Sequence, residues 1–298
     1  MPEQNFGHVV IIGVGLIGGS LARALKQHNA ASKITGVARS RETLDLALQL
    51  GVIDKAENDP AVAVRDADLV ILATPVSTID ALLASISSQL PEHCVITDAG
   101  SVKGSVVKAA RKALGDKIGS FIPGHPIAGT ENSGVAASFA ALFIDHRVIL
   151  TPLEENSEGD IHRVQAMWEL CGARVVRMSI TEHDAILAAT SHLPHLLAFS
   201  LVDFLSQQDH HEEIFANTAG GFRDFTRIAA SSPVMWRDIC LANRDELIPL
   251  LESMEQTLAG YRKLLEKSNG EQLEQSFRRA KTARDQLREI NKEGDKDA

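Results

Sequence analysis

Short apolar runs alternate with segments of helical periodicity through the first part of the chain. The run 9–12 contains no polar residue, which is typical of a strand covered on both faces of a sheet. Strands that alternate with helices predict a parallel sheet with right-handed crossovers, and therefore an α/β fold. The predicted strands are 9–12, 33–38, 67–74, 93–98, 120–123, 147–151 and 173–178, and predicted helices follow the first strand and span 42–50, 79–86, 105–114 and 161–170.

From residue 181 onward the pattern changes to helical periodicity alone. We therefore expect a sheet domain at 1–180 and an all-helical domain at 181–298. Pro194 predicts a kink in the first helix of the second domain. A small domain with long apolar helices often completes its core against a second copy, so a homodimer is expected. The helical patterns span 181–206, 211–230, 234–267 and 271–290.

A glycine-rich turn of spacing G-x-G-x-x-G lies directly between the first strand and its helix. Gly13 permits the tight turn, Gly15 permits close approach of a pyrophosphate, and Gly18 lets the helix pack against the strand. Leu16 and Ile17 open the helix, whose free N–H groups would face the phosphates. The pattern predicts a Rossmann-type, doubly wound sheet that binds a dinucleotide. The alternative is a doubly wound domain that has lost its cofactor or binds another nucleotide.

The end of the second predicted strand bears on which dinucleotide is bound. An acidic residue about 20 positions after the glycine turn would accept a hydrogen bond from the ribose 2′-hydroxyl of NAD. This chain has Ala38 there, followed by Arg39, Ser40 and Arg41. Guanidinium groups suit a 2′-phosphate, so NADP is expected in preference to NAD. The alternative is that the two arginines belong only to a solvated loop.

The carboxyl ends of two other predicted strands carry further candidate residues. Ligands of parallel sheets bind outside these ends. Thr74 and Pro75 follow the third strand, and Ser101 lies in the segment 98–103 after the fourth. We therefore expect both segments to line a cleft for cofactor and substrate.

Composition and charge narrow the range of partners. The net charge of −9 argues against a general nucleic-acid or anionic-membrane surface. No uninterrupted apolar run approaches the roughly 18 residues of a membrane span, and the N-terminal segment lacks the basic start of a signal peptide. Cys94, Cys171 and Cys240 form no C-x-x-C pair. They are interpreted as free thiols, so a cytoplasmic location is expected.

His125 is the first candidate for acid–base chemistry. It lies between Gly124 and Pro126, on a predicted loop that follows the fifth strand at the carboxyl edge of the sheet. A histidine at this edge can take up a proton near neutral pH, whereas many loop histidines are purely structural.

His192 and His195 are spaced to share one face of the predicted helix. With His183 they could be mistaken for a metal site. The H-E-x-x-H pattern is absent and no carboxylate neighbours the pair, so no metal is expected. The alternative to a role in a cleft is a packed histidine pair whose hydrogen bonds are satisfied.

Arginine is the expected anchor for an anionic substrate. The chain has no lysine between Lys117 and Lys263, whereas Arg223 and Arg227 lie in the helical part. Either guanidinium could hold a carboxylate in bidentate fashion. The alternative is that both arginines only pair with Asp224.

Five motifs occur along the chain in the order GVGLIGGSLA, DAGSVK, GHPIAGTENSG, SHLPH and GGFRDFTRIA. In this order they resemble the prephenate and arogenate dehydrogenases, also called cyclohexadienyl dehydrogenases, of tyrosine biosynthesis, and the resemblance covers roughly 8–290. The third and fifth motifs are specific to that family, and the glycine turn is not. The resemblance implies a Rossmann domain followed by a helical dimerisation domain. It also implies oxidative decarboxylation of prephenate to 4-hydroxyphenylpyruvate, or of arogenate to tyrosine, with hydride passing to a nicotinamide.

The resemblance implies roles for individual residues. His125 matches the catalytic histidine, which takes the proton of the ring hydroxyl. Ser101 matches a serine that contacts this hydroxyl and orients the histidine. Arg227 matches an arginine that binds a substrate carboxylate. The other matches around the substrate site are His195, His192, Glu131, Asp224 and Trp236.

The choice of cofactor and the choice of function both stay open. Many family members carry an acid at the end of the second strand and use NAD, whereas Ala38-Arg39-Ser40 resembles the NADP-using arogenate dehydrogenases. Two other functions are possible from the residues alone. One is another NAD(P)-dependent oxidoreductase of the hydroxyacid or imine type, which the missing lysine disfavours. The other is a non-catalytic dinucleotide sensor.

Overall fold

The computed structural model describes residues 5–130 and 132–294, with side chains up to residue 287. Six parallel strands form the main sheet in the order β3-β2-β1-β4-β5-β6. The strand order reverses between β1 and β4, which is the doubly wound arrangement predicted from the sequence. The strands are β1 (His8–Ile12), β2 (Lys33–Val37), β3 (Lys55–Glu57), β4 (Leu69–Leu72), β5 (Val95–Asp98) and β6 (Phe121–Ile122).

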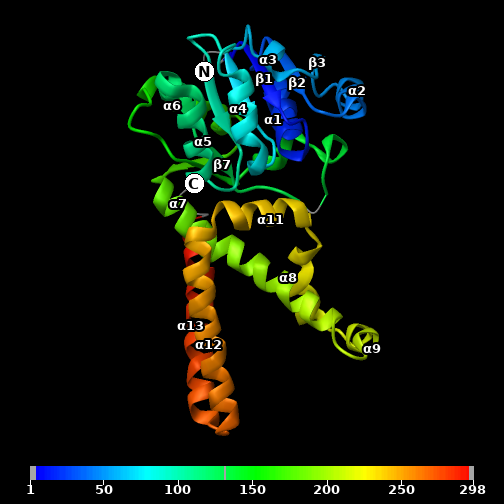
Figure 1. Ribbon diagram of the computed structural model, residues 1–298, viewed down its shortest axis with the longest axis vertical. Helices are drawn as coiled ribbons and strands as arrows, with labels where there is room; N and C mark the ends of the chain where they lie inside the picture. The colour runs from blue at the N-terminus through cyan, green and yellow to red at the C-terminus, as the bar shows by residue number, and fades with distance from the viewer. Residues whose placement is uncertain (1–4, 131, 295–298) are drawn as a thin grey trace. The chain divides into compact units, whose positions relative to one another are not determined.

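Helices cover both faces of this sheet (Figure 1). Along β1, Val9 and Ile11 enter one hydrophobic core, and Val10 and Ile12 enter the core on the opposite face. This two-sided burial explains why the strand is an uninterrupted apolar run. The first core also contains residues of α1 (Leu16–Gln27), α2 (Arg41–Gln49) and α6 (Glu158–Leu170). The second contains residues of α3 (Pro60–Ala63), α4 (Ile79–Ile86) and α5 (Gly104–Leu114).

A second, three-stranded sheet was not predicted. It has the order β7-β8-β9, with β7 (Gly124–Pro126) antiparallel to β8 (Arg147–Leu150) and β8 parallel to β9 (Arg174–Arg177). The prediction that His125 lies on a loop is wrong, because it lies in β7. The last two predicted strands belong to this second sheet and not to the main one. Pro123 lacks an N–H group for a continued ladder after the short β6, so the chain leaves the first sheet there.

The part of the chain after β9 is helical, as predicted. A continuous helix extends from Ile180 to Ser206 and contains a π-helical turn, η5 (Ala188–His192), just before Pro194. This turn is the local distortion that the proline predicted. The parts of this helix on either side of the π-helical turn are α7 (Ile180–Leu187) and α8 (Leu193–Ser206). The helices that follow are α9 (His211–Ala216), α10 (Gly220–Thr226), η6 (Arg227–Ala230), α11 (Pro233–Ala242), α12 (Arg244–Glu266) and α13 (Gly270–Gly294).

The helix Ile180–Ser206 is long and apolar enough to cross a membrane by length and composition, with a mean hydropathy of 1.5. The sequence reading missed this because it considered only uninterrupted apolar runs. Core helices of soluble proteins pass the same test, and this helix places His183, Asp184 and His192 in buried positions. These three polar residues lie in the protein interior, and the helix by itself is weak evidence for a membrane span.

The chain divides into two compact units, Met1–Leu247 and Ile248–Ala298. The first contains both sheets and α1 to α11. In the second, α12 and α13 run side by side as a helical hairpin (Figure 1), with the rings of Tyr261 and Phe277 6.0 Å apart. The predicted domain boundary at residue 180 falls inside the first unit and stays a prediction.

Candidate active site

A cleft of about 570 Å³ opens where β1, β2 and β4 end. Its walls come from residues just after these strands, at the point where the strand order reverses. Ligands of doubly wound sheets bind at this position. The residues predicted from the sequence that line the cleft are Gly13, Gly15, Arg39, Ser40, Thr74 and Pro75.

Each of the three glycines of the turn is required for a different structural reason. Gly13 has a φ of +103°, and a Cβ there would lie 2.4 Å from the carbonyl oxygen of Ala73. A Cβ on Gly18 would lie 2.2 Å from the carbonyl oxygen of Gly13, so α1 packs closely on its strand. A Cβ on Gly15 would meet no described atom within 4 Å. Gly15 thus leaves open space in the cleft, which fits the approach of a pyrophosphate.

The N-terminus of α1 has backbone donors to offer. Gly15 precedes the helix and provides no side-chain cap. The Gly19 N–H donates the first helical hydrogen bond to the Gly15 carbonyl oxygen, at 2.9 Å. Gly18 is buried, and Leu16 and Ile17 pack partly against the core, so these three do not line the cleft. They would contribute N–H groups rather than side chains to a bound phosphate.

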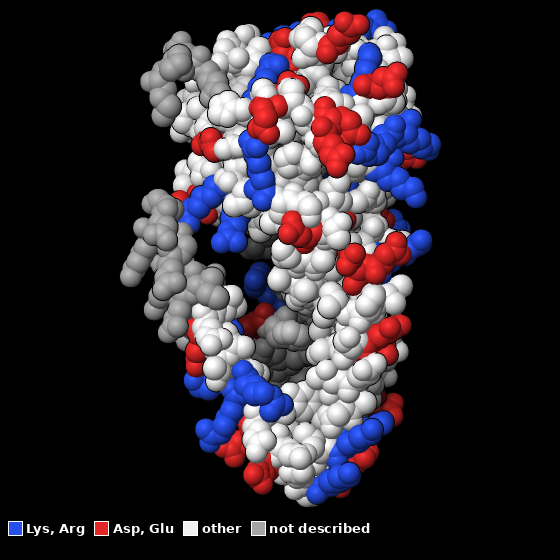
Figure 2. Space-filling view, turned by 90° about the vertical axis from the view of Figure 1, so that its left-hand side faces the viewer, with Lys and Arg blue, Asp and Glu red and all other residues white. Residues whose placement is uncertain are grey.

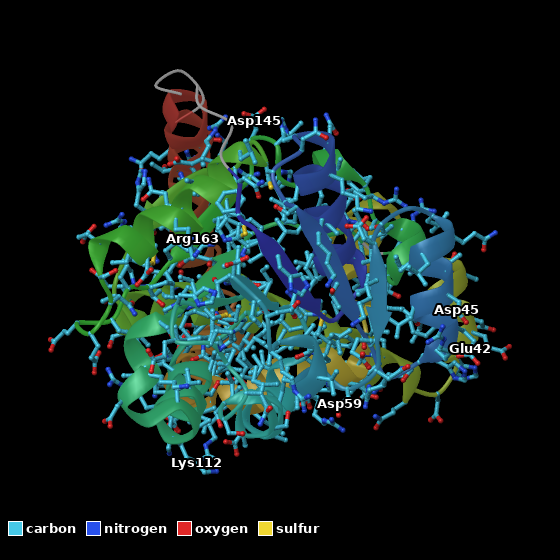
Figure 3. All side chains as sticks on the ribbon, turned by 90° about the horizontal axis from the view of Figure 1, so that it is seen from above. Glu42, Asp45, Asp59, Lys112, Asp145 and Arg163 are labelled. Atoms are coloured by element: carbon cyan, nitrogen blue, oxygen red, sulfur yellow. The ribbon has the colours of Figure 1, made fainter. Side chains whose placement is uncertain are left out.

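Arg39, Ser40 and Arg41 differ in what they can offer a ligand. Arg39 lines the cleft and forms no ion pair among the described residues. Ser40 lines it too, and its hydroxyl donates to the Glu42 carboxylate at 2.6 Å. Arg41 pairs with Asp45 at 2.9 Å and does not line the cleft. Figure 3 shows Glu42 and Asp45 on α2, at the outside of the molecule.

The backbone that carries His125 is clamped by a buried ion pair. The Asp98 carboxylate accepts a hydrogen bond from the Gly124 N–H at 3.1 Å, and the Lys103 ammonium donates to the Gly124 carbonyl at 2.6 Å. Lys103 and Asp98 pair with each other, and both side chains are fully buried. Burial lowers the pKa of Lys103, and the Asp98 charge opposes that shift. Both peptide groups flanking Gly124 are therefore held next to His125.

The His125 ring is held by a chain of hydrogen bonds. Its Nδ1 lies 2.9 Å from His183 Nε2, and His183 Nδ1 lies 2.7 Å from the Asp184 carboxylate. Asp184 also accepts from the N–H groups of Lys103 and Gly104, at 2.8 and 2.7 Å, where α5 begins. The second sheet, α7 and α5 are thus joined through one polar cluster.

His125 is poised to accept a proton. Burial lowers the pKa of His125 well below its usual 6.5, and the positive charge of Lys103 adds to the shift. The imidazole is therefore neutral at pH 7. A neutral imidazole is the form that acts as a general base.

His192 is buried and neutral. Its Nδ1 lies 3.0 Å from Nδ2 of Asn243, which also donates to the Asp184 carbonyl oxygen at 2.9 Å. Because the Asn243 amide donates, His192 carries its proton on Nε2, and this atom has no partner among the described residues. Burial lowers the pKa of His192 to about 4. The unpartnered donor is a candidate to bind a polar group of a substrate.

His195 and Trp236 form a stacked pair. Their ring centroids lie 3.5 Å apart with an interplanar angle of 18°, and His195 Nδ1 donates to the Ser191 carbonyl at 2.8 Å. Burial lowers the pKa of His195, and the nearby charge of Arg227 lowers it further. Trp236 Nε1 is buried without a partner in the described part of the chain. The two stacked rings therefore bring a buried indole N–H without a described partner next to the half-buried His195.

The structure relates Arg227, but not Arg223, to the histidine cluster. Arg227 is exposed on η6 and lies close enough to His195 to shift its pKa. Asp224 is exposed, and no ion pair among the described residues joins it to either arginine. The alternative in which both arginines only pair with Asp224 is thus not what the structure contains, and a substrate role for Asp224 stays a prediction.

Two further predicted residues are not tested by the geometry. Ser101 is half-buried between β5 and α5 and forms no hydrogen bond to His125 among the described residues. Its orienting role stays a prediction. Glu131 lies outside the described residues.

The sequence matches a known family over both of its predicted parts. Residues 21–177 match the family described as prephenate dehydrogenase, nucleotide-binding domain, and residues 179–279 match prephenate dehydrogenase, dimerization domain. The chain belongs to the prephenate dehydrogenase family. The resemblance stated from its motifs is confirmed.

Relatives within the prephenate dehydrogenase family are similar over nearly the whole chain. A cyclohexadienyl dehydrogenase of Zymomonas mobilis is 40% identical over 281 residues, covering 94% of this chain and 95% of the relative. A prephenate dehydrogenase of Bacillus subtilis is 38% identical over 285 residues, covering 94% and 76%.

Solved structures of the prephenate dehydrogenase family share the fold. The enzyme of Aquifex aeolicus, in complex with hydroxyphenyl propionate and NAD+, is 38% identical with a TM-score of 0.88, covering 94% of this chain and 98% of that one. An arogenate dehydrogenase of Synechocystis is 25% identical with a TM-score of 0.79, covering 94% and 99%.

Several members of the site were missed from the sequence of this prephenate dehydrogenase family chain. His183 was considered only as part of a spurious metal site, and Asp184 and Asn243 received no role. The segment 98–103 was expected to line the cleft, but none of its residues lines the cleft at the end of β1, and Asp98 and Lys103 instead bond the backbone of Gly124. No group of three or more His, Cys, Asp and Glu side chains in the described ranges is arranged to hold a metal ion. The contacts that the structure shows within the cluster are hydrogen bonds among side chains and backbone N–H groups.

Proposed function

We propose that this protein oxidatively decarboxylates prephenate, arogenate or both in tyrosine biosynthesis, with NADP favoured as hydride acceptor. The observation that carries the proposal is a buried, neutral His125 beside the carboxyl edge of a dinucleotide-binding sheet, in a chain of the prephenate dehydrogenase family. Family membership favours a cyclohexadienyl substrate over hydroxyacids, imines and a purely sensing role.

The chemistry requires a base, an anchor and a hydride acceptor. When bound, the nicotinamide supplies the acceptor for the hydride that leaves ring C4. His125 Nε2 takes the proton of the C4 hydroxyl as the C–O bond gains carbonyl character. The bond from ring C1 to the carboxylate breaks, CO2 leaves, and its electron pair makes the ring aromatic. The ring oxygen then regains a proton as a phenol, so atoms and charge balance.

Substrate binding is assigned to the cluster around His195. Arg227 would hold a substrate carboxylate as a bidentate charge-assisted pair. Trp236 and His195 would contact the ring, and His192 Nε2 would donate a hydrogen bond. Ser101, Glu131 and Asp224 keep the roles that the family resemblance implies. Because aromatisation drives the reaction, positioning and one base suffice, and no metal is required.

The cofactor is assigned to the cleft at the end of β1. Gly13, Gly15 and the N–H groups of Leu16, Ile17 and Gly18 would bind the pyrophosphate, with Thr74 and Pro75 along the wall. Arg39 favours the 2′-phosphate of NADP, whereas the Glu42 carboxylate beside Ser40 favours a free 2′-hydroxyl. The absence of an acid at Ala38 tips our proposal to NADP.

Four turnover assays test the function. Prephenate or arogenate is combined with NADP or NAD, and reduced nicotinamide is followed by absorbance. We expect turnover, with kcat/KM for NADP exceeding that for NAD by about tenfold, the effect of roughly 1.4 kcal/mol. Turnover in none of the four would refute the function, and higher kcat/KM with NAD would refute the cofactor preference.

The two arginines after Ala38 provide a matched pair for the cofactor assignment. Arg39→Ala is expected to raise the KM for NADP about tenfold and to leave the KM for NAD unchanged, because the guanidinium reaches only the 2′-phosphate. Arg41→Ala is expected to change neither, since Arg41 is paired with Asp45 outside the cleft. Equal effects of the two substitutions would show that the 2′-phosphate is bound elsewhere.

We also propose a cytoplasmic homodimer that binds a small-molecule substrate and neither nucleic acid nor membrane. Large apolar side chains are exposed in the helical part, among them Phe204, Leu241 and Phe277, at 56 to 61% exposure. A second copy that covers such residues fits the dimerization-domain match. On the face in Figure 2, Lys and Arg are interspersed with Asp and Glu. Cys94, Cys171 and Cys240 are free thiols, which suits a reducing compartment.

A further inference from the structure

Three polar side chains form a line that ends on the proposed base. His125 Nδ1 lies 2.9 Å from His183 Nε2, and His183 Nδ1 lies 2.7 Å from Asp184 Oδ1. All three side chains are buried, with residue exposures of 8%, 0% and 7%. Water does not reach these atoms freely, so each donor and acceptor role must be satisfied within the line.

Asp184 determines which atoms donate and which accept in the hydrogen bonds of this line. Burial would raise the pKa of Asp184, but hydrogen bonds from His183 and from two backbone N–H groups hold it below the usual value. Those N–H groups belong to Lys103 and Gly104 and are donated where α5 begins, a position that favours negative charge. Asp184 is therefore an ionised carboxylate, which can only accept hydrogen bonds.

Because Asp184 only accepts, the nitrogen that carries the proton is determined for both His183 and His125. His183 Nδ1 must donate to Asp184, so a neutral His183 has an unprotonated Nε2 that accepts. His125 Nδ1 must then donate to His183, and the lone pair of His125 lies on Nε2. A doubly protonated His183 would reverse this last bond and leave His125 with a proton on Nε2, unable to act as base there. The inference therefore concerns the form of the cluster in which His183 carries a single proton, on Nδ1.

We propose that His183 and Asp184 are positioning residues that fix the Nδ1–H tautomer of His125, so that Nε2 is the atom that takes the substrate proton. This inference deepens the proposed function and rests on it for the identity of the proton donor. When Nε2 gains the proton, His125 becomes an imidazolium. The His183 acceptor and the Asp184 charge behind it stabilise that cation, which lowers the barrier to proton transfer.

The charged and titratable groups that face His125 come from four elements. They are the Lys103–Asp98 pair at the end of β5 and the start of α5, His183 and Asp184 on α7, and His192 on η5. Positive charge on Lys103, His183 or His192 opposes protonation of His125, so His183 can stabilise an imidazolium only as a neutral acceptor. Asp184 is the one carboxylate connected to the His125 ring through hydrogen bonds among the described residues. Removal of the Asp184 charge therefore acts on the His125 ring in a way that the other groups cannot replace.

The test uses Asp184→Asn, with His183→Gln as its matched control. Asp184 accepts from His183 Nδ1 and the Lys103 N–H through Oδ1, and from the Gly104 N–H through Oδ2, so an asparagine loses an acceptor in either orientation of its amide. It also loses the negative charge, so the His125 tautomer is no longer held by a carboxylate and the form with the proton on Nε2 becomes populated. We expect kcat to fall by at least about 100-fold, within the range for loss of general-base catalysis, with the KM for NADP within about twofold of wild type. The glutamine carbonyl of His183→Gln can still accept from His125 Nδ1, so a loss of less than about tenfold is expected.

Ring 15N NMR measures the tautomer without turnover. With His125 assigned by comparison with His125→Asn, we expect wild type and His183→Gln to carry the proton on Nδ1, and Asp184→Asn to carry it on Nε2 in part of the population. A wild-type His125 protonated on Nε2, or an Asp184→Asn enzyme with unchanged kcat, would overturn the inference. If wild type turns over neither substrate, the proposed function fails while the NMR result still decides the tautomer. Should Asp184→Asn not fold, His183→Leu replaces it, with the same loss of kcat expected and unchanged kcat overturning the inference.

Discussion

The His125→Asn enzyme is expected to lose about 1,000-fold in kcat while its Kd for NADP stays within about twofold of wild type. General-base catalysis by one side chain contributes typically 10²–10⁴-fold, and asparagine can bond the ring hydroxyl but cannot take its proton. His125 lies in β7 and outside the residues that line the cofactor cleft, so binding of the dinucleotide is expected to be preserved. Steady-state kinetics and fluorescence titration with NADPH measure the two effects separately.

The pH dependence of wild-type activity also tests the role of His125 as the general base. Burial and then the Lys103 charge lower the pKa of His125, so the neutral base is retained as the pH falls through 6.5. Activity is expected to decline only at a pH well below 6.5, and this acid limb should be absent from the residual activity of His125→Asn. His146→Asn is the matched control, since His146 is exposed and its side chain bonds only the Ile144 carbonyl among the described residues. Unchanged kcat in His125→Asn would remove the catalytic role.

Arg227→Ala is expected to raise the KM for the cyclohexadienyl substrate by about 10- to 100-fold. Hydrogen bonds to charged groups contribute roughly 1.5–3 kcal/mol, which corresponds to this range. The KM for NADP is expected to stay unchanged, because Arg227 lies beside His195 and not in the cofactor cleft. Initial rates measured with each reactant varied in turn separate the two constants.

Two neighbouring substitutions control for loss of charge alone. Arg223→Ala removes an equally exposed arginine for which the structure gives no link to the histidine cluster, and it should change the substrate KM little. Arg227→Lys keeps the charge but loses the bidentate geometry, so an intermediate KM is expected. A larger effect for Arg223→Ala, or an Arg227→Ala enzyme that loses only cofactor affinity, would reassign the substrate anchor.

The local parts of this molecule were predictable from its sequence. The glycine turn is specified by backbone sterics within a few residues, and the structure gives Gly13 and Gly18 the close contacts that the motif requires. A local distortion near Pro194 was likewise predictable, and the structure has a π-helical turn just before this proline, which lacks an N–H group. Arg41 and Asp45 are four residues apart on a predicted helix, so their ion pair could have been predicted from the sequence. Arg41 was instead expected to bind the cofactor, and it does not line the cleft.

The non-local parts were not predictable in the same way. His125 and His183 are 58 positions apart, and their contact depends on how α7 packs against a three-residue strand bounded by prolines. Lys103 was seen in a motif, but a lysine is expected at the surface, and its burial follows only from the position of Asp98 and the Gly124 carbonyl. Hydrogen-bond partners across the fold decide this site, and periodicity along the chain does not report them.

The stoichiometry of the products tests the central claim most directly. Purified enzyme is given prephenate or arogenate with excess NADP, and released CO2 and reduced nicotinamide are measured in the same reaction. Oxidative decarboxylation predicts equal amounts of the two, together with a phenolic product. Reduced nicotinamide without CO2 would indicate a simple alcohol oxidation, and absence of both products with either substrate would contradict the account.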